Sequence, residues 1–473
     1  MNDAPLRRLA NTVLVPGLCA DVLPSWIQRA ADDGLAAVCW FSGAALGEVG
    51  GRRAELLVLA DEEGGNVTRL EAEQGSSWPG NAALGVVDDV TVTEQVAGGI
   101  AAMARRAGID VVLAPVVDVN SEPDNPVIGV RSFGAETGLV ARHGAAFVRG
   151  VQAQGVAACA KHFPGHGATR TDSHVGIPVV DADRDTFLAR DVTPFAAAID
   201  AGVRCILTAH VSVPAVDAAP ATMSSAWMSM LRGELGFQGV VISDALDMHA
   251  ISRGVGRGPG AVRALAAGVD LLCIGNPCFP EPYDSEAVFV AIVDEIVRAV
   301  AAGELAVERL EEAASRIAGL KERLANAAPL APDADAAGLG DDIARRAVQA
   351  VGDVRLDGPP HVVVEQRTDI AAGLRPSPIV AALVVRAPGT TSVSVRTVDE
   401  VAAALEPAIG QPVVLVTDRL AGDEVLQALR GLRPDTVVVD TGVVGDGAAG
   451  PAVRVFGSSA ATAAAATELL FPN

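Results

Sequence analysis

Short apolar runs recur along the first 275 residues of the chain, and stretches of helix length separate them. Each run has the Val, Ile, Leu and Ala content of a buried strand. The stretches between them carry helical patterning, and several end in glycine, as helices commonly do. Eight such units in about 250 residues predict an α/β fold, a (β/α)8 TIM-like barrel, in preference to an open doubly wound sheet. The predicted strands are Thr12–Val15, Ala36–Phe41, Leu56–Ala60, Ile109–Ala114, Val156–Cys159, Cys205–Thr208, Gly239–Ile242 and Val269–Ile274. The predicted helices include Pro24–Asp33, Val92–Gly108, Glu136–Gln154, Asp185–Gly202 and Pro259–Gly268.

A change in the pattern near residue 327 predicts a second domain. The helical stretch Ser285–Asn326 closes the barrel half, and Ala327–Asp335 then brings two prolines and acidic residues, which is typical of a linker. We expect a barrel over residues 1–328, a linker over 329–340 and a smaller C-terminal α/β sandwich with a largely parallel sheet over 341–473. A structural or dimerising role is favoured for this domain over a second catalytic site, since it holds one histidine, His361. Its predicted strands are His361–Val364, Ile379–Val385, Pro412–Val416 and Thr436–Asp440, and its predicted helices are Val398–Leu405, Gly422–Leu432 and Ala460–Leu470.

The charge and the cysteine content exclude several classes of partner. The formal net charge of −22 repels nucleic acid and anionic membrane surfaces, so neither is expected as a partner. The six cysteines lie mostly in apolar runs, where a buried thiol is the simple interpretation, and none forms a CxxC pair that would indicate structural zinc. The N-terminus lacks the apolar core of a signal peptide, and no segment approaches about eighteen consecutive apolar residues, which predicts a cytoplasmic protein in a reducing compartment. We expect a monomer or a homodimer.

Polar residues stand directly after the predicted strands, which is where a barrel carries its functional groups. The spacing of the sequence alone indicates this placement, which supports the barrel more strongly than residue propensities do. After the third to the seventh run, the polar residues are Asp61, Asp118, Asn120, Lys161, His162, His210 and Asp244.

The segment Lys161–His174 holds three of the chain's seven histidines. Lys161 and His162 offer several hydrogen-bond donors for the hydroxyl groups of a polyol or a sugar, and the alternative is a loop held by internal hydrogen bonds. Asp172 stands two residues before His174, close enough in a bent loop to orient the imidazole for general acid and base catalysis. The alternative is that Asp172 and His174 are surface residues without a catalytic role, since an isolated Asp-x-His is common by chance.

Two further carboxylates allow more than one interpretation. Asp244 ends a predicted buried strand and suits a nucleophile, a metal ligand or a helix N-cap. Asp61 precedes a glycine pair and Arg69, and it could bind vicinal hydroxyl groups or form a turn with a salt bridge.

The chain has no GxSxG elbow, P-loop or HExxH motif, which excludes the usual serine hydrolase, NTPase and zincin sites. The main rival chemistry is a metal site built from His162, His166, Asp172 and His174.

Taken together, four motifs resemble those of the β-N-acetylglucosaminidases of glycoside hydrolase family 3, over roughly residues 10–325. The motifs are Asp61-Glu62-Glu63-Gly64-Gly65 with Arg69, Arg131-Ser132-Phe133-Gly134, Lys161-His162-Phe163-Pro164-Gly165-His166-Gly167 with Asp172-Ser173-His174, and Ser243-Asp244-Ala245-Leu246-Asp247-Met248. The resemblance implies that Asp244 is the nucleophile of a retaining mechanism and that His174, paired with Asp172, is the general acid and base. It implies that a terminal N-acetylglucosamine is bound by Asp61, Arg69, Arg131, Lys161 and His162.

The activity implied by the resemblance is a retaining exo-β-N-acetylglucosaminidase that acts on a small carbohydrate substrate through a glycosyl-Asp244 intermediate, with no metal and no other cofactor. Recycled cell-wall (muropeptide) fragments are the implied natural substrate.

Glu62 stands where glutamine is common in the family, and Ala168 and Ala245 stand where aspartate is common, which bears on substrate preference. Three alternatives stay open. The first is a phosphorylase that resolves the same intermediate with phosphate, because His174 would not repel an incoming phosphate as a carboxylate would. The other two are a metal-dependent barrel hydrolase and a sugar-binding protein without catalysis.

Overall fold

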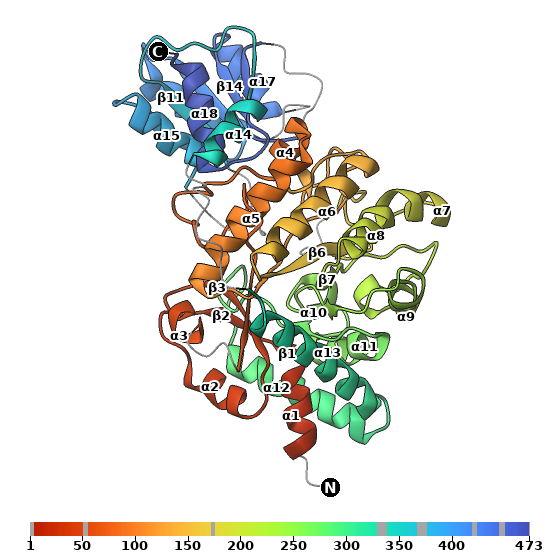
Figure 1. Ribbon diagram of the computed structural model, residues 1–473. Helices are drawn as coiled ribbons and strands as arrows, with labels where there is room; N and C mark the ends of the chain where they lie inside the picture. Colours follow the sequence, from red (N-terminus) through yellow and green to blue (C-terminus); the bar gives the residue numbers. More distant parts are fainter. Residues whose placement is uncertain are drawn as a thin grey trace. The chain divides into compact units, whose positions relative to one another are not determined.

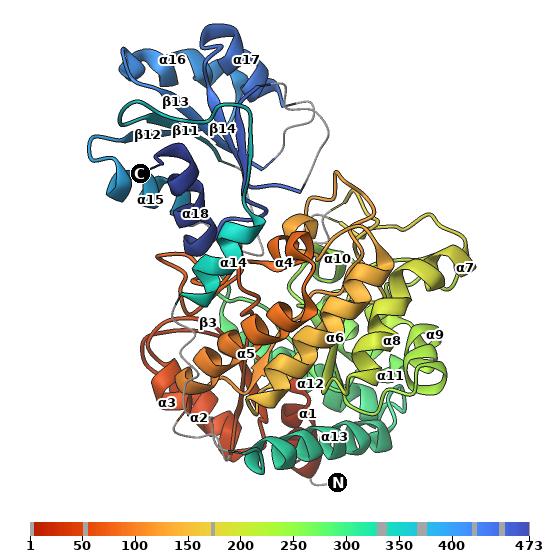
Figure 2. The ribbon, with the colours of Figure 1, turned by 45° about the horizontal axis from the view of Figure 1, so that its top comes forward.

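The computed structural model describes residues 4–50, 55–171, 176–328, 338–366, 376–418, 423–443 and 450–472. These residues divide into two compact units, which Figures 1 and 2 show in two views. Most of the predicted linker lies outside the described residues, so the predicted domain limits stay a prediction. The first unit contains Met1–Glu62, Thr93–Ile128 and Ala135–Ala334, and the second contains Glu63–Val92, Gly129–Gly134 and Asp335–Asn473.

The first unit is built on parallel strands that account for all eight predicted runs. Strands β2 to β8 form a seven-stranded parallel sheet in chain order, and β1 pairs with β9. A bridge between Ile242 and Leu271 links β8 to the segment that enters β9. This is a TIM-like barrel-type α/β arrangement, as the pattern predicted. The strands are β1 (Leu14–Val15), β2 (Gly17–Cys19), β3 (Ala37–Ser42), β4 (Leu57–Ala60), β5 (Val111–Val112), β6 (Ala157–Phe163), β7 (Cys205–Thr208), β8 (Val240–Ile242) and β9 (Leu272–Cys273).

Alternate residues of these strands share one apolar core. In β3, for example, Ala37 and Cys39 belong to this core, whereas Val38 between them is fully buried on the other face. Successive side chains of a strand point to opposite faces, so the sheet is covered on both sides, which explains why its strands read as continuous apolar runs. The polar residues that follow the strands are therefore presented from a rigid edge.

Helices cover the outer face of the sheet. In both views α5, α6 and α8 lie side by side, and α1 lies beside α12 and α13. The predicted helical stretch Ser285–Asn326 is two helices, because the chain turns at Gly303, whose φ is +73°. Among the described residues, no helix is both long and apolar enough to cross a membrane. The helices of this half of the chain are α1 (Ala4–Thr12), α2 (Ser25–Asp32), α3 (Leu46–Gly50), α5 (Val90–Ala107), α6 (Thr137–Ala153), α7 (Arg184–Phe187), α8 (Thr193–Asp200), α9 (Ser225–Ser229), α10 (His249–Ser252), α11 (Arg257–Ala267), α12 (Ser285–Ala301) and α13 (Val307–Ala325).

The cysteines fall into two groups. Four are buried free thiols, as expected: Cys39, Cys159, Cys205 and Cys273. The other two, Cys19 at the end of β2 and Cys278 beyond β9, form a disulfide that joins residues 259 apart in the sequence. Such bonds persist in oxidising compartments and are rare in the cytoplasm, so this bond is at odds with the reducing location expected from the sequence.

The second unit is a six-stranded sheet covered by helices on both faces. The strand order is β10-β15-β14-β13-β11-β12, and every pair is parallel except β10 with β15. Alternate strand residues pack against α15 and α18 on one face and against α16 and α17 on the other. A largely parallel α/β sandwich was predicted for this part of the chain. Its elements are α4 (Asn81–Val87), α14 (Leu339–Ala347), β10 (Gln349–Val351), β11 (His361–Glu365), α15 (Pro378–Arg386), β12 (Thr391–Val395), α16 (Val401–Leu405), β13 (Val413–Thr417), α17 (Glu424–Leu432), β14 (Val437–Asp440), β15 (Ala452–Arg454) and α18 (Ala460–Leu470).

One predicted strand of this unit is wrong. Ile379–Val385 forms most of helix α15, which buries Ile379 and Leu383 and leaves Val384 and Val385 exposed. Residues four apart lie on the same face of a helix, and Pro378 at its first turn suits a helix start. The strand that follows β11 is instead β12, a largely exposed edge strand with too few apolar residues to stand out in the sequence.

A segment from the barrel half of the sequence, Glu63–Val92, belongs to the second unit. Helix α4 contributes Ala82 and Ala83 to an apolar cluster with Ala347 of α14 and Phe456. The backbone N–H of Ala460, at the start of α18, donates to the carbonyl of Ser76 at 2.9 Å. Residues 63–92 are thus part of the core of this unit.

Candidate active site

Lys161 and Asp61 form a charged pair at the carboxyl edge of the first unit's sheet. Lys161 lies near the end of β6 and Asp61 directly follows β4. The Lys161 Nζ donates to Asp61 Oδ1 at 2.8 Å, and the exposed fractions of the two side chains are 3% and 20%. The structure thus brings together two residues that the sequence predicted to bind a sugar, in a position that is only partly open to solvent.

Asp118 anchors the segment His162–Gly167, which we call the strap. Its carboxylate, fully buried beyond β5, accepts hydrogen bonds from His162 Nδ1 and from the backbone N–H of His166, both at 2.7 Å. The backbone N–H of His162 lies 3.3 Å from both carboxylate oxygens. Burial by itself would raise the pKa of Asp118, but the charges and hydrogen bonds of His162 and His166 outweigh it and lower that pKa from its ordinary value. Because a carboxylate only accepts, Nδ1 of His162 carries a proton.

Close backbone approach explains the glycines of the strap. A Cβ atom on Gly167 would lie 2.0 Å from the carbonyl oxygen of Val119. Gly165 has a φ of +135° and its Cβ would lie 2.6 Å from Cβ of Asp191. Asn125 Nδ2 donates to the carbonyl of His166 at 2.9 Å. The strap is therefore seated tightly on its surroundings.

His166 is a buried part of this arrangement. Burial lowers its pKa, and the nearby charges of Asp118 and Asp244 act in the opposite direction. Its Nδ1 lies 2.9 Å from Thr169 Oγ1, and its ring lies 6.3 Å from that of His162. Among the described residues, no three His, Cys, Asp or Glu side chains are arranged to hold a metal ion.

Asp244 lies at the same edge of the sheet, directly after β8. Its backbone N–H donates to the carbonyl of Thr208 at 3.1 Å, and its Oδ1 accepts from the backbone N–H of Ala245 at 2.8 Å. The residue is half-buried, so its carboxylate is not enclosed in packed core. A carboxylate held by its own turn and open on one side suits attack on a bound substrate.

His210 supports the Asp244 turn from β7. Its Nε2 lies 3.0 Å from the carbonyl oxygen of Ala245 and its Nδ1 lies 2.9 Å from Thr222 Oγ1, and the ring is fully buried. Since a carbonyl only accepts, Nε2 of His210 is a protonated nitrogen. The sequence indicated that His210 and Asp118 follow strands, but it gave neither residue a role. Their partners, Ala245 and His162, are 35 and 44 residues away in the sequence.

Arg69 and Arg131 belong to the second unit, together with Glu63. The Arg131 guanidinium makes a two-pronged ion pair with Glu63, with Nε to Oε2 at 3.0 Å and Nη2 to Oε1 at 2.8 Å. Both side chains are at least nine-tenths buried. The Gly64-Gly65 pair permits a close backbone approach, since a Cβ on Gly65 would lie 2.5 Å from Cα of Gly80. Asp172 and His174 lie outside the described residues, so their pairing stays a prediction.

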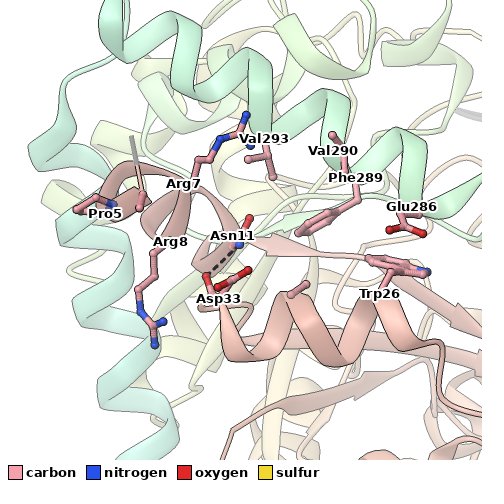
Figure 3. Close-up of a pocket in the computed structure, with 12 residues that line it drawn as sticks. Pro5, Arg7, Arg8, Asn11, Trp26, Asp33, Glu286, Phe289, Val290 and Val293 are labelled. Carbon is pink, nitrogen blue, oxygen red and sulfur yellow. Dashed lines mark hydrogen bonds between the residues drawn. The ribbon is translucent and has the colours of Figure 1, made fainter. Parts of the chain in front are cut away.

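A cavity of about 600 Å³ on the flank of the first unit is separate from these residues (Figure 3). It lies between α1, α2 and α12 and has Trp26 and Phe289 as its aromatic wall. Of its charged lining residues, Arg7 is paired with Asp294 and Glu286 is paired with Arg29. None of the predicted site residues lines it.

Comparisons with known proteins agree with the resemblance seen in the sequence. Residues 50–320 match the family model of the glycosyl hydrolase family 3 N terminal domain. The chain is 37% identical over 326 residues to beta-hexosaminidase A of Pseudoalteromonas piscicida, a match that covers 64% of this chain and 54% of that protein. It is 39% identical over 252 residues to the beta-hexosaminidase of Stenotrophomonas maltophilia (strain R551-3), covering 52% of this chain and 70% of that protein. The match thus spans about half the length of the first relative.

A solved structure is similar over both units. It is a glycoside hydrolase family 3 beta-N-acetylglucosaminidase from Paenibacillus sp. str. FPU-7, with a TM-score of 0.84 and 29% sequence identity. The likeness covers 98% of this chain and 96% of that chain. With the family model matching more than half of its residues, the chain belongs to glycosyl hydrolase family 3.

Proposed function

We propose that the protein is a retaining exo-β-N-acetylglucosaminidase that releases a terminal N-acetylglucosamine from a small glycoside. The observation that carries the proposal is the group formed by Lys161–Asp61, His162–Asp118 and the half-buried Asp244 at one edge of one sheet. The names of the similar proteins, beta-hexosaminidase and beta-N-acetylglucosaminidase, support the substrate class.

In the proposed reaction, Asp244 attacks the anomeric carbon and forms a glycosyl ester, which water then hydrolyses with retention of configuration. His174, paired with Asp172, protonates the departing oxygen and later activates the water, the roles that the family resemblance assigns to them. Lys161 and Asp61 hold hydroxyl groups of the sugar, and Asp118 fixes the ring orientation of His162 for the same purpose. Arg69 and Arg131 complete the proposed set of sugar-binding residues on the resemblance alone. On the same ground, the natural substrates proposed are cell-wall (muropeptide) fragments.

The experiment is hydrolysis of an aryl N-acetyl-β-glucosaminide by the wild type and by Asp244→Ala. Loss of the nucleophile should lower kcat by about 10³-fold or more. Asp185→Ala is the matched control, because the Asp185 side chain is 95% exposed and should leave kcat unchanged. Full activity of Asp244→Ala would contradict the proposal.

Product analysis separates the alternatives. Proton NMR should show the β-anomer of N-acetylglucosamine as the first product. Sugar 1-phosphate formed in phosphate buffer would instead indicate a phosphorylase. Loss of activity after chelation would indicate a metal-dependent hydrolase, and binding of N-acetylglucosamine without turnover would indicate a sugar-binding protein.

A further inference from the structure

Asp191 is a fully buried carboxylate directly behind the strap. It lies in the π-helical turn Leu188–Val192, between α7 and α8, and its exposed fraction is 0%. A Cβ atom on Gly165 would meet Asp191 Cβ at 2.6 Å and its Cγ and Oδ1 at 3.4 Å. Only glycine therefore lets the strap lie this close to Asp191. The proposed reaction assigns this residue no role.

The two carboxylate oxygens of Asp191 differ in their surroundings. Oδ2 accepts from Nε and lies 2.8 Å from Nη2 of Arg190. Oδ1 has no hydrogen-bond partner among the described residues. An ionised carboxylate normally accepts at both oxygens, and a buried one that does so at a single oxygen is poorly stabilised. Burial raises the pKa of Asp191 to about 6, with Arg190 opposing the shift and the charge of Asp118 adding to it.

The influence of Asp118 connects Asp191 to the sugar-binding group. The charged groups that act on Asp191 are Arg190 of its own turn and Asp118 from the segment after β5. The strap between them carries His162 and His166, both bound to Asp118. Ionisation of Asp191 therefore places a second negative charge next to the carboxylate that holds the strap.

We propose that Asp191 is a positioning residue for the strap, and that its neutral form keeps His162 in the orientation that binds the sugar. Once ionised, Asp191 repels Asp118, and its Oδ1 requires a donor that the strap in this conformation does not supply. The strap then shifts, and affinity for the sugar falls. This inference rests on the proposed function, because sugar binding is its readout.

The test is the pH dependence of KM and kcat for the aryl N-acetyl-β-glucosaminide between pH 5 and pH 8. In the wild type, KM should rise severalfold with a midpoint near pH 6, whereas in Asp191→Asn it should stay near the low-pH value throughout. Asp185→Asn is the control and should reproduce the wild-type profile. A wild-type KM that does not change over this range, or the same rise in Asp191→Asn, overturns the role of Asp191.

A second variant covers the case in which Asp191→Asn fails to fold. Arg190→Gln removes the cation that opposes the pKa shift, so the midpoint of the KM titration should move to higher pH. A residue with a purely structural role would not move this midpoint, and an unmoved midpoint contradicts the inference. Absence of any wild-type turnover would be a different result, because it would refute the proposed glycosidase and not Asp191 specifically.

Discussion

Replacing Asp118 by alanine should destabilise the first unit and weaken sugar binding together. The change removes the acceptor of three donors, the N–H and Nδ1–H of His162 and the N–H of His166. Each buried donor left without a partner costs about 1–3 kcal/mol, so the free energy of unfolding should fall by roughly 3–6 kcal/mol, allowing for partial relaxation. This is a large part of the roughly 5–15 kcal/mol that stabilises a typical domain.

The loss can be measured by urea unfolding, followed by tryptophan fluorescence. Trp26, Trp40 and Trp227 report on the first unit. Asp183→Ala provides the scale, because Asp183 is an exposed N-cap of α7 whose loss should cost about 1 kcal/mol. Asp118→Asn should lower the free energy of unfolding less than Asp118→Ala does, since the amide oxygen still accepts from the backbone N–H of His166. It should nevertheless raise KM, because the amide NH2 group would face Nδ1–H of His162 and two donors cannot hydrogen-bond.

The pH dependence provides a further check. Folding lowers the pKa of Asp118 from its ordinary value, so its contribution is complete above the ordinary carboxyl range and is lost as pH falls through the lowered pKa. The difference in free energy of unfolding between wild type and Asp118→Ala should therefore be larger at pH 5 than at pH 3. A destabilisation below about 1 kcal/mol at pH 5, or one that does not shrink towards pH 3, would refute the assignment of Asp118 as the anchor of the strap.

Two other outcomes follow from the geometry. Gly167→Ala should lower stability, by about 1–3 kcal/mol or more, and should also lower activity, because its Cβ would lie 2.0 Å from the carbonyl of Val119. Gly319→Ala in α13 is the control, with nothing within 4 Å of its Cβ, and equal behaviour of the two variants would contradict this account. Thiol titration of the denatured, unreduced protein should find four free thiols, rising to six after reduction, whereas six before reduction would show that Cys19 and Cys278 are not joined.

The sequence predicted local features well. Buried parallel strands read as continuous apolar runs, so each of the eight predicted runs of the first unit corresponds to a strand of the structure. The segment that contains the strap stands out in the sequence because Lys161–His174 holds three of the chain's seven histidines, a local feature. The one strand predicted in place of α15 failed because a short run of Ile, Val and Leu suits either element.

The remaining features depend on pairs that are distant in the sequence. Asp118 meets His162 at a separation of 44 residues, and Arg131 meets Glu63 at a separation of 68. Cys19 and Cys278 are farther apart still, and Asp191 contacts Gly165 only because the turn before α8 folds back beneath it. A pattern within a short window of the sequence does not indicate such pairs, because they depend on which strands and turns are neighbours in the fold.

The packing of residues 63–92 into the second unit has a consequence for any attempt to shorten the protein. A fragment cut after residue 328 would keep α4 but lose Ala347 and Phe456, the apolar partners of Ala82 and Ala83. It would also leave the Ser76 carbonyl without the N–H of Ala460. The isolated N-terminal piece should therefore expose apolar side chains and an unsatisfied carbonyl group, and we expect it to aggregate rather than fold as a self-sufficient protein.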